Sequence, residues 1–164
     1  MHSWDNFFVA EAGSSAALAG LVFVGISINL VKIMSFPHLP QRALDAIALL
    51  AVVLLVSCMM LIPDQSNTAI ALEILVTGLA GWSITTFPSI AGRHKVPEQY
   101  VRVTNRAFVY KQLATLPYIV GGILMFPGTG FSGSCALLFV AAGSMVCFIV
   151  ALMNSWILLV EINR

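Results

Sequence analysis

Long apolar stretches alternate with short polar connections along the whole chain. Each stretch approaches the roughly 20 predominantly apolar residues that an α-helix needs to cross the hydrocarbon core of a bilayer. Five such helices are predicted, at residues 12–33, 41–62, 69–91, 107–126 and 134–162. The pattern therefore predicts an all-α protein in which residues 1–164 form a single transmembrane domain, a five-helix bundle.

Composition and net charge fit a chain whose solvent is lipid. Hydrophobic residues make up 59% of the sequence and charged residues only 9%, whereas about a quarter of the residues in a soluble domain are charged. In water such a chain would expose too much apolar surface, so the lipid bilayer is its expected environment. The net charge of +1 and the lack of a nucleic-acid-binding motif predict no nucleic-acid partner.

The basic residues predict how the chain is oriented, because lysine and arginine are enriched in cytoplasmic connections. With five crossings, all eight basic residues fall at one face: Lys32, Arg42, Arg93, Lys95, Arg102, Arg106, Lys111 and Arg164. The opening MHSWDN lacks the basic n-region of a signal peptide, so the first helix should stay in the mature protein. We expect a multi-pass protein of the cell inner membrane, with its N-terminus outside and its C-terminus cytoplasmic.

The first predicted helix has two distinct faces at helical spacing. One face is polar at its ends and apolar in its middle, and consists of Glu11, Ser15, Leu18, Val22, Gly25, Asn29 and Lys32. Small residues populate other positions, namely Gly13, Ala16, Ala17, Gly20 and Ser27. Small residues let helices approach closely in lipid, so this small face predicts a helix-packing seam, with a neighbour from the same chain or from another.

The polar face permits two interpretations. In the first, Asn29 hydrogen-bonds another helix, Lys32 extends to the lipid headgroups and Glu11 lies at the outer interface. In the second, several copies surround an axis and the face lines a pore. Acidic rings and apolar constrictions are known channel devices, and Glu11 would form the ring, with Leu18 and Val22 as the constriction.

Acidic residues elsewhere in the predicted spans have simpler interpretations. Asp45 lies in the first turn of its helix, where the helix dipole favours a carboxylate, and Arg42 precedes it by three residues. Asp45 is therefore predicted to be structural. Glu73 is predicted to be interfacial or to contact an ion. Glu161 lies near the inner boundary, where it is predicted either to form an ion pair with Lys32 that ties the last helix to the first or to lie at a water-exposed helix end.

The predicted fourth helix contains Pro117 followed by Gly121 and Gly122. Proline and glycine are common causes of helix kinks. This pattern predicts either an ordinary packing bend or a hinge that takes part in gating.

Catalytic, cofactor and metal-binding motifs are missing from the sequence, so we expect no enzyme, no cofactor and no metal site. The three histidines do not cluster by spacing, and no cysteine pair has metal-ligand spacing. The cysteines lie in apolar runs, where cysteine behaves as a small hydrophobe. A Cys58–Cys135 disulfide would also fit, because both residues fall near the same predicted membrane face.

The opening WDNFFVAEAGSSAALAGLVFVGISINL and the ending WILLVEINR resemble a family of small bacterial multi-span membrane proteins. Some similar proteins carry the label of modulator of the membrane protease FtsH. The resemblance implies an adaptor role and supplies no catalytic residues.

Three functions follow as hypotheses. The first is a homo-oligomeric pore or ion channel lined by the first helix. The second is a non-catalytic adaptor or regulator of another membrane protein, for example a membrane protease. The third is a small-solute transporter.

Overall fold

The computed structural model describes residues 4–36, 39–92 and 101–162. These residues form α1 (Asp5–Ile28), α2 (Leu30–Ser35), α3 (Leu39–Met60), α4 (Asn67–Ala91), α5 (Val101–Leu124) and α6 (Gly133–Ile162). All but α2 are long and apolar enough to cross a membrane. The predicted all-helical class and the predicted set of five long apolar helices are confirmed.

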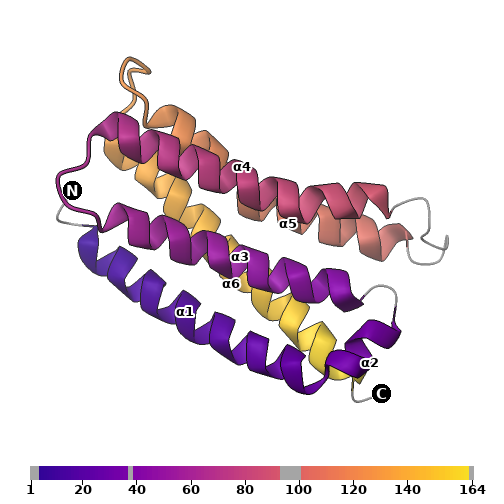
Figure 1. Cartoon of the computed structure of the whole chain (residues 1–164). Coiled ribbons are helices and arrows are strands. Elements are labelled where there is room, and N and C mark those ends of the chain that lie inside the picture. The colour runs from indigo at the N-terminus through magenta and orange to yellow at the C-terminus, as the bar shows by residue number, and fades with distance from the viewer. Residues whose placement is uncertain (1–3, 37–38, 93–100, 163–164) are drawn as a thin grey trace.

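Helix α3 is the centre of the bundle, because it contacts α1, α4 and α6. Helix α5 packs between α4 and α6, whereas α1 lies at the edge and packs mainly on α3 (Figure 1). The described chain begins at one end of the bundle and finishes at the other (Figure 1). This antiparallel threading brings the described basic residues Lys32, Arg42, Arg106 and Lys111 toward one end, here called the basic end.

The first predicted helix is divided in the structure. It begins at Asp5 and ends at Ile28, and Asn29 separates it from the short α2. The Asn29 side chain donates to the Gly25 carbonyl at 3.0 Å. Asparagine competes in this way for backbone hydrogen bonds and is therefore a weak helix former, which fits its place at the break.

Other helix ends follow local chemistry. The Ser66 hydroxyl caps α4 by accepting a hydrogen bond from the Ala69 amide at 3.2 Å, as expected of serine at this position. Pro88 stays inside the last turns of α4. Helix α5 begins at Val101, earlier than the predicted apolar span, and residues 93–100 lie outside the described part of the chain.

The bundle is apolar on both its inside and its outside. Its core includes Leu49, Val53, Ile74 and Val140, all 1% exposed or less. Large apolar side chains are also exposed on each of the helices. Lipid is the solvent that tolerates such an outer surface, because contiguous exposed apolar patches of this extent are rare in soluble monomers.

Glycines bring α4, α5 and α6 close together. A Cβ atom at Gly122 would lie 2.9 Å from the Leu75 backbone nitrogen on α4, and one at Gly121 would lie 3.1 Å from the Ala136 carbonyl oxygen on α6. The sequence predicted a packing bend or a hinge at these two glycines. In the structure, both glycines make tight contacts with neighbouring helices. Hinge motion stays a prediction.

We predict that Gly122→Ala destabilises the bundle by about 1–3 kcal/mol, because the added methyl group overpacks a contact with backbone atoms. Gly13→Ala is the matched control, since no atom lies within 4 Å of a Cβ at that position. Thermal unfolding of both purified variants in detergent measures the difference. Equal unfolding temperatures for Gly122→Ala and wild type would contradict the observed packing.

Candidate functional site

The polar face of α1 turns into its own bundle over the first half of the helix. Glu11 is only 4% exposed and Ser15 is fully buried. Leu18 and Val22 pack against the main hydrophobic core. All four were predicted to line a pore shared by several copies. Glu11 and Ser15 are instead enclosed by parts of their own chain, whereas Leu18 and Val22 are only partly buried. Their role in a pore stays a prediction.

The remaining positions of this face have a different environment. Gly25 and Lys32 are exposed, and Asn29 is half-buried at the break between α1 and α2. The predicted pore-lining face is therefore not one continuous surface in the folded chain.

The small face of α1 points away from the described parts of its own chain. Its members are all exposed: Gly13, Ala16, Ala17, Gly20 and Ser27. A Cβ atom at Gly13 or Gly20 would meet nothing within 4 Å. The predicted seam thus has no partner among the described residues of its own chain.

Glu11 belongs to a group of buried polar side chains drawn from four helices, here called the Glu11 cluster. The Ser57 hydroxyl of α3 donates to Glu11 Oε2 at 3.2 Å. Ser144 of α6 also lies close to the carboxylate, and Tyr118 of α5 is hydrogen-bonded to Ser144 at 2.8 Å. The cluster consists of Glu11, Ser57, Tyr118 and Ser144.

The hydroxyl groups of the cluster can be arranged as a chain of donors. Ser144 Oγ lies 3.2 Å from the Val140 carbonyl oxygen, to which it can donate while it accepts from Tyr118. A hydroxyl group has one rotatable proton and two acceptor lone pairs. The Ser144 proton can therefore point to Val140 or turn toward Glu11.

Glu11 lacks a positively charged partner within the described part of the chain. Its Oε1 atom is buried without a hydrogen bond, and the ion pair between Asp45 and Lys111 does not involve Glu11. An isolated buried carboxylate is strongly disfavoured unless it is neutralised or paired. The geometry therefore suits a carboxylate that takes up a proton or contacts a small cation.

A second group of buried polar side chains lies toward the basic end, and in it a carboxylate is paired with a cation. Asp45 of α3 forms a buried ion pair with Lys111 of α5. Gln41 donates to the same carboxylate at 2.8 Å, and Lys111 also donates to Ser89 of α4 at 2.7 Å. Asp45 was predicted to be structural, with Arg42 as its neighbour. The sequence pattern did not reveal Lys111, which is distant along the chain.

Further polar contacts join α4 to its neighbours. Trp82 donates to Gln112 at 2.6 Å, and Gln112 donates to Thr86 at 3.1 Å. Glu73 accepts from Gln65 at 2.8 and 3.0 Å. This internal partner for Glu73 was not predicted.

The remaining sequence predictions have separate outcomes. Cys58, Cys135 and Cys147 are free thiols, so a Cys58–Cys135 disulfide is not present. The side chain of Glu161 lies outside the described part of the structure, and so does the predicted Lys32–Glu161 ion pair. No group of three or more candidate metal ligands occurs among the residues that the structure describes.

Comparison with known proteins adds no relative: no family model, no curated protein and no solved structure matches this chain.

We predict that Lys111→Met destabilises the bundle by about 3–5 kcal/mol, because removing one partner leaves the Asp45 carboxylate buried without compensation. The double variant Asp45→Leu/Lys111→Met should recover most of this loss. The free energies of unfolding in mixed detergent give the comparison, and Lys32→Met is the exposed control. A Lys111→Met variant as stable as the control would show that the pair is not structurally important.

Proposed function

We propose that this chain is a multi-pass protein of a bacterial inner membrane that moves protons or small cations, with Glu11 as the carboxylate that takes up and releases the ion. The observation that carries the proposal is the enclosed Glu11 carboxylate, which has one free oxygen and no cationic partner among the described residues. An ionisable group inside a membrane bundle is costly and is by default a candidate functional site.

The position of Glu11 along its helix supports access from one side of the membrane. Glu11 lies six positions after Asp5, where α1 starts, and at the helical rise of 1.5 Å per residue this distance is about 9 Å. The orientation proposed from the basic residues puts this end outside. A proton or cation from the outer solution then has a short route to Glu11.

The bundle interior separates the Glu11 cluster from the Asp45–Lys111 pair. Ser57 lies twelve positions after Asp45 on α3, which is about 18 Å along the helix axis. Leu49 and Val53, both 0% exposed, occupy the space between. An apolar layer of this kind supports a closed state, in which transfer requires a conformational change.

Helix α5 connects the two polar groups and supplies a place for that change. Lys111 and Tyr118 both lie on α5, and Pro117 stands between them inside the helix. A change of bend at Pro117 would move the Tyr118 hydroxyl relative to Ser144. This motion is the gating role we propose for the predicted hinge.

We predict that protein reconstituted into liposomes carries a proton or cation flux that Glu11→Gln reduces at least about tenfold. The substitution removes the charge and keeps the shape, so it abolishes the ion site with little change in packing. Internal pH- and cation-sensitive dyes report the flux under an imposed voltage. Glu73→Gln is the matched control, because Glu73 is a half-buried acid with an internal partner.

Two results would refute this proposal. One is wild-type protein that stays silent across voltage, pH and membrane tension. The other is Glu11→Gln protein with wild-type flux.

A second candidate function rests on the small face of α1. Its residues are exposed and leave room for a close backbone approach, which is how helices associate in lipid. The same stripe on a second copy would supply both sides of a two-fold interface. We propose a homo-oligomer joined through α1; an adaptor would use this face to bind a different membrane protein.

We predict that Gly20→Leu converts the oligomer to monomers, because the large side chain blocks the close approach of two α1 helices. The variant should fold normally, since nothing lies within 4 Å of a Cβ at Gly20. Light scattering in detergent measures the mass, and Ala142→Leu on the exposed side of α6 is the control. A monomeric wild type would contradict self-association, and stoichiometric co-purification of another protein would favour the adaptor.

A further inference from the structure

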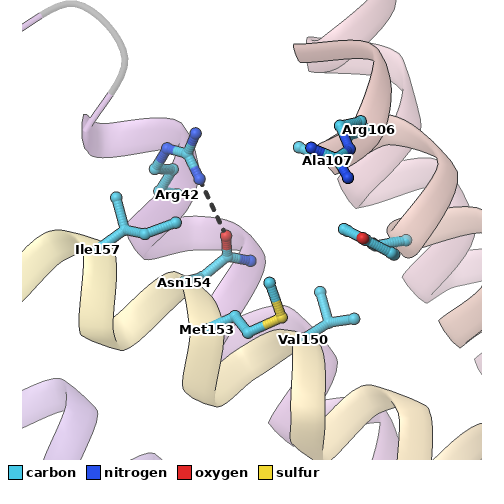
Figure 2. Close-up of a pocket in the computed structure, with 8 residues that line it drawn as sticks. Arg42, Arg106, Ala107, Val150, Met153, Asn154 and Ile157 are labelled. Atoms are coloured by element: carbon cyan, nitrogen blue, oxygen red, sulfur yellow. Dashed lines mark hydrogen bonds between the residues drawn. The ribbon is translucent and has the colours of Figure 1, made fainter. Parts of the chain in front are cut away.

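A pocket of about 250 Å³ opens at the basic end of the bundle, far along the helices from Glu11. Its walls come from α3, α5 and α6 (Figure 2). Arg42 and Asn154 lie on one side, and Arg106 lies across from them on α5 (Figure 2). The polar groups of three different helices therefore converge on one space.

Asn154 has an unused hydrogen-bond donor at this pocket. The residue is only 6% exposed. Arg42 donates from Nη1 to Asn154 Oδ1 at 3.4 Å, and because arginine is only a donor, this contact assigns the amide oxygen to the Arg42 side. The Nδ2 atom is buried without a partner, a state that is costly and calls for an explanation.

The pocket is electrically suited to an anion. Two guanidinium groups line it, those of Arg42 and Arg106. Asp45 interacts with Arg42, but its carboxylate is already paired with Lys111. Guanidinium groups and an amide N–H together form a donor set that phosphate oxygens match well.

Apart from Tyr110 on α5, whose side chain carries a hydroxyl group, the rest of the wall is apolar and continues out of the pocket. Val150, Met153 and Ile157 complete the lining on α6. Met153 and Ile157 also border a neighbouring hollow with Leu152 and Trp156. A donor-lined pocket beside an apolar hollow matches an amphiphile, whose charged group and hydrocarbon chain need these two environments.

We propose that this pocket binds the phosphate of an anionic phospholipid, with an acyl chain of the same lipid along Met153, Trp156 and Ile157. The bound phosphate accepts from Asn154 Nδ2 and lies between the charges of Arg42 and Arg106. This site is separate from the ion-binding function proposed for Glu11, and neither depends on the other.

The test measures how much phosphatidylglycerol remains bound to the full-length protein after purification into a neutral detergent, by native mass spectrometry and lipid titration. We expect one tightly held phosphatidylglycerol in the wild type and affinity about tenfold lower in Arg106→Gln, because a charge-assisted hydrogen bond is lost. Arg106 is exposed, so this variant should fold. Lys32→Gln, which removes an exposed cation outside the pocket, should keep wild-type affinity.

Asn154→Leu gives a second measurement at a buried position. It should also weaken phosphatidylglycerol binding about tenfold while its thermal unfolding stays close to that of the wild type, since the lost donor has no partner inside the protein and the lost acceptor makes only a long contact of 3.4 Å with Arg42. Equal losses in Arg106→Gln and Lys32→Gln would overturn the proposal, because they would indicate general charge attraction. Displacement of the lipid by millimolar inorganic phosphate alone would overturn the assignment to a lipid.

Discussion

In the membrane setting that we propose, a polar group inside this bundle must find its partner within the protein, because lipid outside the helices would offer none. Asp45 meets that requirement through Lys111, Gln41 and the surrounding helices. Glu11 meets it only in part, since one carboxylate oxygen accepts from Ser57 and the other has no partner. Asp45 has a cationic partner, so its role is structural. Glu11 has an oxygen without a partner, so it is the candidate functional residue.

The packing of α1 follows from the same constraint. Its polar residue Glu11 turns toward α3, where the Ser57 hydroxyl donates to it, and its small residues turn outward. Tight glycine contacts instead join α4, α5 and α6. The bundle thus has a closely packed part built from α3 to α6 and a peripheral α1 that carries Glu11, so the Glu11 cluster lies at the junction between the two.

The apolar runs were sufficient to predict the helices, because the length of hydrocarbon to be crossed sets the length of each run. Helical periodicity also placed Glu11 and Ser15 on one face of the first helix. Periodicity does not, however, predict which neighbouring helix that face contacts. Lys111 as the partner of Asp45, and Ser57 as the partner of Glu11, depend on contacts between distant segments. The break between α1 and α2 at Asn29 accompanies a local side-chain hydrogen bond, which the length of the apolar run does not predict.

Glu11 faces α3 of its own chain, where the Ser57 hydroxyl donates to it, and cross-linking between these two positions can test this placement. The double variant Glu11→Cys/Ser57→Cys, with the three native cysteines replaced, would be treated in native membranes with a short reagent that bridges two thiols. We predict a bridge within one chain. Mass spectrometry would then show a monomer in which one reagent molecule links the two cysteines. Covalent dimers formed through Glu11→Cys alone would contradict it, because they would place this face between copies.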